Sequence, residues 1–209
     1  AGSGGAIYLS NSSQVWLDDY AADMPSVDGN SALNGGAIYA DGSPSVRCDG
    51  SIFSANSATT GSGGAIYLTA SSSRAENCIF DGNTATLNGG AIAAYAGSSL
   101  DVKANLGSTT LAAEEAALPG THNSIQATTC NPADRQCSSF SANQADSDSD
   151  NIGYGGAIYN NDGDLSINQT YFHRNQAYAG GAIFQSGASA SAVVTDTLIY
   201  SNTVTYALG

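Results

Sequence analysis

This sequence has few basic residues and no long apolar run, and each shortage excludes a class of protein. Lys and Arg number 5 against 18 Asp and Glu, which gives a formal net charge of −13. A surface of that sign repels phosphate backbones and anionic lipid headgroups, so we expect no nucleic-acid partner. No apolar run approaches the roughly 20 residues that a transmembrane helix needs, so we expect no direct membrane insertion. Neutral glycans and divalent cations remain as candidate ligands.

Cysteine is also scarce, and the 4 residues do not fit a zinc site. Cys48, Cys78, Cys130 and Cys137 lack the close pairs of a zinc ribbon, and His122 completes no recognisable ligand pattern. Four cysteines allow three pairings. We expect two disulfides formed outside the cytosol, and the alternative is four reduced, partly buried thiols.

What the sequence has in abundance is a pattern of two glycines, an alanine, an isoleucine and usually a tyrosine. The pattern returns at steps of about 25 to 31 residues, with one step of about 66, and such a period predicts a solenoid of stacked coils. Its copies begin at Gly4, Gly35, Gly63, Gly89, Gly155 and Gly180. Paired glycines would let neighbouring coils approach closely and adopt backbone angles that other residues avoid.

A second pattern, an aromatic residue followed three places later by asparagine, recurs in phase with the first. Its aromatic residues are Phe53, Phe80, Phe140 and Phe172, and Val27 and Ile199 hold the same position in two further units. Stacked coils would place these side chains in one interior column at a spacing of about 4.8 Å. The asparagines would form a ladder that satisfies backbone groups at a buried turn. They are Asn30, Asn56, Asn83, Asn143, Asn175 and Asn202.

These periods predict an all-β fold, a single parallel β-helix of about seven coils with two or three strands each. The domain spans residues 1–209, and an inserted loop interrupts it at residues 98–137. Within the loop, residues 111–118 form a short helical run that Pro119 and Gly120 stop. Loops carry function more often than scaffolds do, so this insertion is a candidate location for specificity.

Together the two patterns, GGAI and FxxN, resemble the repeats of the chlamydial polymorphic outer-membrane proteins and related bacterial β-helix passenger domains. The resemblance covers nearly the whole chain apart from the insertion, and it departs from the pattern at Val27 and Ile199. It implies a right-handed parallel β-helix at an extracellular or cell-surface location, as in surface-exposed adhesins.

The ends of the chain suggest its function. The last coil lacks the glycine-pair strand with which the chain starts, and neither end shows a cap. We therefore expect a non-catalytic structural solenoid that stacks head-to-tail with copies of itself into a surface fibre. The contact would use Gly4, Gly5, Ala6, Ile7, Tyr8 and Leu9 at one end and Tyr200, Asn202, Val204, Tyr206 and Leu208 at the other.

Two alternatives stay open. The chain is also consistent with a passenger segment of a larger cell-surface adhesin that binds glycans or receptors. A polysaccharide-acting enzyme is the second alternative, because enzymes also use the β-helix. A glycosidase needs two carboxylates across a groove, and Asp18 with Asp19 is the only tight acidic pair near a predicted strand, so we expect no enzyme.

The tyrosine position of the repeat suggests a contact surface. If the isoleucines face the core, strand alternation puts the rings outside as a column that can stack on sugars or bury a lateral contact. The alternative is that the rings face inward. The residues are Tyr8, Tyr39, Tyr67, Tyr159 and Phe184, with Ala93 as the gap.

The remaining candidate sites are two acidic runs and two N-glycosylation triplets. The acidic runs carry the residue types that calcium prefers, but neither completes an EF-hand loop, so we expect no cofactor and keep calcium as the alternative to solvated turns. The candidate ligands are Asp146, Asp148, Asp150, Asp162 and Asp164. Asn11 and Asn168 begin N-glycosylation triplets, which matter only where the source glycosylates.

Overall fold

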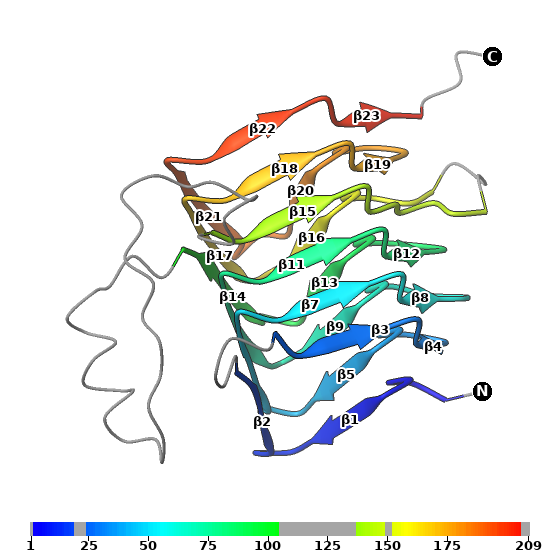
Figure 1. The fold of residues 1–209 in the computed structure, drawn as a ribbon, viewed down its shortest axis with the longest axis vertical. Helices are drawn as coiled ribbons and strands as arrows, with labels where there is room; N and C mark the ends of the chain where they lie inside the picture. Colours follow the sequence, from blue (N-terminus) through cyan, green and yellow to red (C-terminus); the bar gives the residue numbers. More distant parts are fainter. Residues whose placement is uncertain (1, 19–23, 105–136, 149–151, 206–209) are drawn as a thin grey trace.

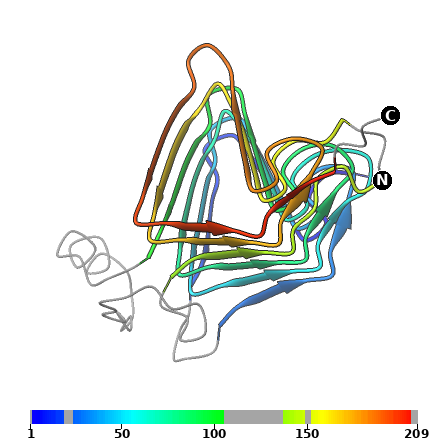
Figure 2. The same ribbon diagram turned by 90° about the horizontal axis from the view of Figure 1, so that it is seen from above.

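The computed structural model describes residues 2–18, 24–104, 137–148 and 152–205. These residues form a parallel β-solenoid whose coils stack along the longest axis of the molecule, with the N-terminal coil at one end and the C-terminal coil at the other (Figure 1). Seen along that axis, the coils superimpose (Figure 2). The all-β class and the parallel β-solenoid are therefore confirmed. Among the described residues, no helix is long and apolar enough to cross a membrane.

Four sheets run along the stack. Sheet A contains β1 (Ile7–Ser10), β5 (Ile38–Asp41), β9 (Ile66–Thr69), β13 (Ile92–Tyr95), β16 (Ile158–Asn161) and β20 (Ile183–Ser186). Sheet B contains β2 (Gln14–Leu17), β6 (Ser45–Asp49), β10 (Ser72–Glu76), β14 (Ser99–Lys103), β17 (Asp164–Asn168) and β21 (Ser191–Thr195). Sheet C contains β3 (Ser26–Asp28), β7 (Ile52–Ser54), β11 (Ile79–Asp81), β15 (Ser139–Ser141), β18 (Tyr171–His173) and β22 (Leu198–Tyr200). Sheet D consists of the short strands β4 (Ser31–Ala32), β8 (Ser57–Ala58), β12 (Thr84–Ala85), β19 (Gln176–Ala177) and β23 (Thr203–Val204).

The three long sheets have 6 strands each, so the stack has six coils rather than about seven. The long step in the glycine period holds one coil and the insertion, because β13 pairs directly with β16. Five of the six coils have four strands rather than the two or three predicted, and the coil of β13, β14 and β15 has three, with an isolated bridge at Gln144 in place of the short fourth strand. Sheet B forms from the segments between the glycine-pair strand and the aromatic strand, and sheet D adds a two-residue strand after the asparagine in five of the coils.

The insertion begins later than predicted. Residues 99–103 form β14, which pairs with β10 and β17 and so belongs to the coil rather than to a loop from residue 98. The predicted helix at 111–118 lies outside the described residues, as do His122 and Asp19.

The core consists of columns of like residues, because the register places each coil directly on the next. Phe53, Phe80, Phe140 and Phe172 are wholly buried. Neighbouring rings in this column lie 4.6 to 4.9 Å apart with interplanar angles of 5° to 6°. Aromatic pairs of this kind contribute about 0.5–1.5 kcal/mol each beyond the area they bury. The predicted aromatic column is therefore a main element of the core.

The glycine pair has two separate roles, which Gly63 and Gly64 illustrate. Gly63 has a φ of +70°, a conformation that glycine adopts without the steric penalty of a Cβ. A Cβ at Gly64 would lie 2.0 Å from the carbonyl oxygen of Gly90 in the next coil. The second glycine is thus required for the close approach of neighbouring coils, as the repeat predicts.

Candidate functional site

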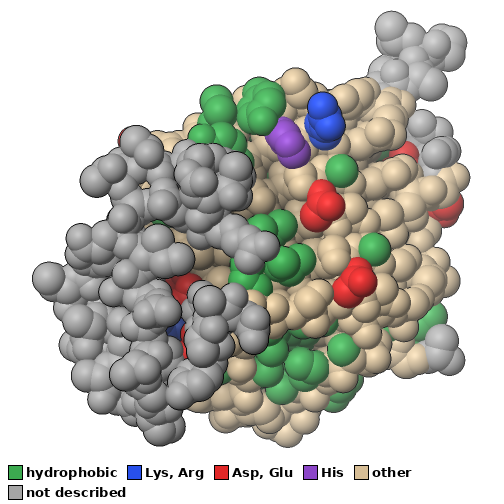
Figure 3. All heavy atoms as spheres, viewed as in Figure 1, with side chains coloured by type: hydrophobic (Ala, Val, Ile, Leu, Met, Phe, Trp, Pro, Cys, Tyr) green, Lys and Arg blue, Asp and Glu red, His purple; other side chains and the backbone are tan. Residues whose placement is uncertain are grey.

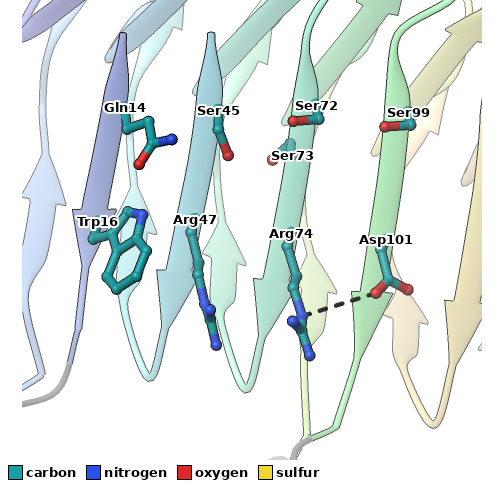
Figure 4. Close-up of a pocket in the computed structure, with 9 residues that line it drawn as sticks. All are labelled: Gln14, Trp16, Ser45, Arg47, Ser72, Ser73, Arg74, Ser99 and Asp101. Carbon is teal, nitrogen blue, oxygen red and sulfur yellow. Dashed lines mark ion pairs between the residues drawn. The ribbon is translucent and has the colours of Figure 1, made fainter. Parts of the chain in front are cut away.

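A groove crosses the outer face of sheet B over four neighbouring coils. Outward side chains alternate with core residues along each strand, and the parallel register arranges them in two rows from coil to coil (Figure 4). The first row holds Gln14, Ser45, Ser72 and Ser99, and the second holds Trp16, Arg47, Arg74 and Asp101. The groove has a volume of about 500 Å³, within the range of small-molecule binding sites.

A buried carboxylate organises the charged part of this groove. Glu76 is wholly buried, and its carboxylate lies 2.5 Å from Arg74 Nη2. The same carboxylate lies 3.5 Å from Lys103 Nζ and 3.7 Å from Arg47 Nη2. Asp101 lies 3.0 Å from Lys103 Nζ and 3.9 Å from Arg74 Nε. Breaking a buried ion pair costs about 3–5 kcal/mol, so this network holds both arginine side chains in place.

The network contains Arg47, Arg74 and Lys103, three of the 5 basic residues of the chain. Their charges are balanced locally, because Glu76 and Asp101 pair with them. Asp49 adds a third carboxylate in register with Glu76. The groove is therefore close to neutral, and it presents hydrogen-bond donors and acceptors rather than an excess of one charge.

Trp16, the only tryptophan, lies at the N-terminal end of the groove and is 43% exposed. The guanidinium carbon of Arg47 lies 5.3 Å from the centroid of its ring, a distance at which the cation and the aromatic face attract each other. This contact orients the indole beside the polar rows, so the groove contains one aromatic surface.

A second surface feature is the ring column along sheet A. Tyr8, Tyr39 and Tyr67 stack with centroid separations of 5.2 and 4.9 Å. The isoleucines that precede the last two, Ile38 and Ile66, are wholly buried. Strand alternation therefore puts the rings on the face of sheet A opposite the core.

The sequence suggests a gap in this column at Ala93, and the structure fills it from another position. The ring of Tyr95, two residues further along the same strand, lies 5.2 Å from that of Tyr67 and 5.1 Å from that of Tyr159. Phe184 continues the column, 5.8 Å from Tyr159. The column is thus continuous over all six strands of sheet A.

Apart from Tyr8 in the first coil, which is 57% exposed, the rings of the column are half-buried or buried. The hydroxyl of Tyr95 accepts a hydrogen bond of 2.9 Å from Asn88 Nδ2 and lies 2.9 Å from the Ser62 hydroxyl. Burial raises the pKa of Tyr39 and Tyr95, and it raises the pKa of Tyr67 from 10.0 to about 12. Contact of these rings with a glycan or a neighbouring molecule stays a prediction.

The six repeat asparagines form one polarised ladder, which Asn83 illustrates. Its Oδ1 accepts hydrogen bonds from the backbone N and Nδ2 of Asn56, both at 3.0 Å. Its Nδ2 donates to Asn143 Oδ1 at 2.9 Å and to the backbone oxygen of Phe53 at 3.0 Å. Equivalent bonds join the neighbours from Asn30 to Asn202. The asparagine-to-asparagine hydrogen bonds therefore all point the same way, from Nδ2 to the Oδ1 of the next coil towards the C-terminal end of the stack.

The C-terminal coil leaves the interior columns uncovered. Ile199 continues the phenylalanine column above Phe172 and is 48% exposed, and Val194 lies above Ile167 and is 44% exposed. Phe172 and Ile167 themselves are buried. Figure 3 shows hydrophobic side chains gathered on the surface over β22, at the top of the view. Apolar side chains that belong to the core pattern are therefore accessible at this end.

The expectation that all four cysteines form disulfides is wrong for Cys48 and Cys78. Both are free thiols that are wholly buried. Cys48 pairs in register with Ala75, three residues before Cys78, so the two cysteines fill the core from different positions of the coil. Burial, together with a hydrogen bond involving Cys48, raises the pKa of the Cys78 thiol well above 9.0. Cys137 is disulfide-bonded, and Cys130 lies outside the described residues.

The candidate calcium ligands are not gathered in the described part of the chain. No three His, Cys, Asp or Glu side chains come together there as a metal site would require, and Asp150 lies outside that part. Asp162 Oδ1 accepts a hydrogen bond from the backbone N of Ser189, and Asp164 Oδ1 accepts one from the Ser191 hydroxyl. These two carboxylates thus accept hydrogen bonds from the next coil, and calcium binding stays a prediction.

The predicted glycosylation sites lie at the surface turn and strand end of the first and fifth coils. Asn11 is exposed in the turn between β1 and β2, and Asn168, at the end of β17, donates from Nδ2 to the Thr195 hydroxyl. Glycosylation of either asparagine stays a prediction. Tyr206 and Leu208, expected at the assembly contact, lie outside the described residues.

The sheet B groove was not predicted from the sequence, although a signal for it exists. Ser45, Ser72 and Ser99 recur at equal steps, since 72 − 45 = 27 and 99 − 72 = 27, and Arg47 and Arg74 share that step. Nothing in the sequence marks Glu76 as the buried centre of their ion pairs.

The stacked coils, the glycine contacts and the asparagine ladder define a repeat protein of the parallel β-solenoid class. Residues 26–41, 50–69 and 77–95 match the Chlamydia polymorphic membrane protein (Chlamydia_PMP) repeat, which confirms the resemblance. Each matched stretch contains the sheet C, D and A strands of consecutive coils, whereas the strands of sheet B lie outside it. No curated protein and no solved structure matches the chain. The repeats suggest a surface-associated protein and fit a passenger-like segment of a surface adhesin.

Proposed function

We propose that this chain is a non-catalytic structural segment of a cell-surface adhesin, and that a further coil of the same kind lies on its C-terminal coil. The observation that carries this proposal is the exposure of the interior columns at Ile199, Val194 and Val204. Fully burying an aliphatic side chain contributes about 1.5–3 kcal/mol, and these side chains are about half exposed, so covering each would contribute about half of that. Among the described residues β20, β21 and β22 each pair with a strand on one side only, so their other edges present backbone donors and acceptors that a further coil would satisfy.

The state of the groove carboxylates supports a non-catalytic role. Glycoside hydrolysis uses two carboxylates that face each other across the scissile bond. In the groove, Glu76 is wholly buried against Arg74, and Asp101 lies 3.0 Å from Lys103. These carboxylates bind cations of the protein itself rather than facing each other across a space for a scissile bond, which supports a role without catalysis.

Surface location is tested by labelling intact source cells with an antibody raised against the purified chain. We expect signal without permeabilisation and its loss after external protease. A periplasmic or cytoplasmic marker serves as the control for cell integrity. Signal that appears only after permeabilisation would exclude the adhesin segment.

A head-to-tail fibre is the second candidate, and the polarity of the asparagine ladder favours it. No described residue donates a hydrogen bond to Asn30 Oδ1 at the N-terminal end, and no described asparagine lies beyond Asn202. A second copy stacked by its first coil would bring Asn30 Oδ1 over the backbone N–H of Asn202. The ladder, the apolar columns and the parallel strand direction would then continue across the contact.

Adjacent residues of β21 provide a matched test of this contact. Val194 lies in the interior column, whereas Val193 pairs with Ser166 on the outward face and is 60% exposed. We expect Val194→Asp to abolish concentration-dependent association and Val193→Asp to leave it unchanged, measured by sedimentation velocity and negative-stain electron microscopy. A wild-type chain that stays monomeric at every concentration would exclude the fibre and leave the adhesin segment.

A further inference from the structure

We propose that the groove on the outer face of sheet B binds an uncharged oligosaccharide. The inference goes beyond the structural role above and does not depend on stacking or surface location, because the groove lies wholly within four coils of this chain. It also differs from the half-buried ring column of sheet A, which faces a different side of the solenoid.

The dimensions of the groove suit an extended sugar chain. Its rows cross β2, β6, β10 and β14 at the strand spacing of a parallel sheet, which is about 4.8 Å. That spacing is close to the length of one pyranose unit in a chain. Successive sugar units would therefore meet equivalent side chains in successive coils, as the serine row illustrates (Figure 4).

The aromatic and polar groups of the groove are those that a sugar requires. Trp16 supplies an exposed aromatic surface for the apolar C–H face of a pyranose ring. The hydroxyls of Ser45, Ser72 and Ser99 and the amide of Gln14 can each donate and accept hydrogen bonds. Sugar hydroxyls also donate and accept, so the two sets are complementary.

The charges of the groove favour a neutral ligand over an acidic one. The guanidinium groups of Arg47 and Arg74 already pair with Glu76, and Asp101 adds a half-buried carboxylate at the groove that would repel an anion. The net charge of −13 acts in the same direction at longer range. The arginines therefore serve as positioned hydrogen-bond donors rather than as an anion site.

The groove is rigid before any ligand arrives. Its side chains stand on four hydrogen-bonded strands, and the ion pairs of Glu76 hold the arginines of β6 and β10. Preorganisation of this kind lowers the ordering cost of binding. All groove residues also lie outside the stretches that match the repeat, so the matched repeat accounts for the scaffold and not for this face.

Trp16 makes binding directly measurable, because its fluorescence is the only indole signal of the chain. Purified full chain is titrated with cellohexaose, chitohexaose and maltohexaose, and with a heparin hexasaccharide as the acidic probe. We expect at least one neutral hexasaccharide to change the fluorescence with a Kd between about 1 μM and 1 mM, and the acidic probe to bind more weakly. No response to any neutral probe, or tighter binding of the acidic one, would overturn the proposal.

Variants then assign the site, with binding measured by calorimetry and folding checked by circular dichroism. Trp16→Ala should weaken binding about tenfold or more, equivalent to roughly 1.4 kcal/mol. Tyr8→Ala, which removes another exposed ring of the first coil, should leave binding unchanged. Asp101→Asn in the groove should weaken binding several-fold, whereas Asp164→Asn, further along the same sheet, should not. Equal effects of the paired variants would contradict the assignment.

Discussion

Replacing Asn83 by alanine should destabilise the solenoid strongly, because this side chain lies in the middle of the buried ladder. The variant loses four side-chain hydrogen bonds, two accepted from Asn56 and one donated to each of Phe53 and Asn143. It leaves the backbone N–H of Asn56 and the carbonyl of Phe53 buried without these partners. At about 1–3 kcal/mol for each of these two unsatisfied buried groups, we expect a loss of about 2–6 kcal/mol in the free energy of unfolding.

Asn30→Ala is the matched control at the end of the same ladder. Its Nδ2 donates to Asn56 Oδ1 and to the carbonyl of Asp28, and Asn56 Oδ1 keeps its bond from the Asn30 backbone N. Asn30 is also half-buried, so water replaces part of what is lost. We expect a cost of about 1 kcal/mol.

Asn83→Asp tests the direction of the ladder through pH. The new oxygen would face two acceptors, the carbonyl of Phe53 and Asn143 Oδ1, so the carboxylate is disfavoured in the folded state. Its folded pKa should rise above the unfolded value of about 3.9. The folded state then binds the proton more tightly, and the variant should become more stable relative to the wild type as the pH falls from neutral towards that value.

Urea denaturation followed by far-ultraviolet circular dichroism measures these effects. Fluorescence of Trp16 reports the first coil separately, which matters because repeat arrays can lose cooperativity. If Asn83→Ala and Asn30→Ala cost the same within about 0.5 kcal/mol, the ladder does not stabilise the fold as argued.

Three further predictions concern single groups. The hydroxyl of Ser73 is buried without a hydrogen-bond partner, so Ser73→Ala should stabilise the chain by about 1 kcal/mol. Ser71→Ala, which removes hydrogen bonds to two backbone carbonyls, should instead destabilise it, and a loss of stability in both variants by thermal denaturation would refute this reasoning. Burial raises the pKa of Tyr67 from 10.0 to about 12, so the stability it contributes is present below pH 10 and falls as the pH rises through that interval. Tyr67→Phe should therefore flatten the alkaline decrease in unfolding free energy, and an unchanged decrease would contradict the shift. Cys48 and Cys78 are wholly buried and the pKa of Cys78 is raised, so neither should react with a disulfide reagent until the chain unfolds. Rapid reaction of the folded protein with the reagent would show that the two thiols are accessible.

The sequence alone specifies much of the fold because a solenoid depends on a local period. Each coil contacts only its neighbours, so residues one period apart, such as Phe53 and Phe80, are brought together without long-range information. The glycine pairs and asparagines follow the same rule, since Gly64 and Asn83 each contact their equivalents in the next coil.

Other features depend on how the coil closes in three dimensions. In β10 the alternation is made of serine, arginine and alanine, which gives a weak strand signal, yet the strand pairs with β6 and β14 and carries the centre of the groove. Cys48 and Cys78 illustrate the same limit, because the sequence does not show that both thiols lie unbonded in the core.

The sequence by itself thus determined the repeat, the aromatic column, the asparagine ladder and the requirement for glycine. Each follows because like residues recur at one period and therefore stack on one another in neighbouring coils. Only the tertiary structure decided the number of coils, the substitution of the Tyr95 ring for Ala93, and the convergence of Arg47, Arg74 and Lys103 on Glu76. These outcomes depend on which side chains of successive coils can reach a common point in space. That choice is made by packing and charge pairing rather than by the period.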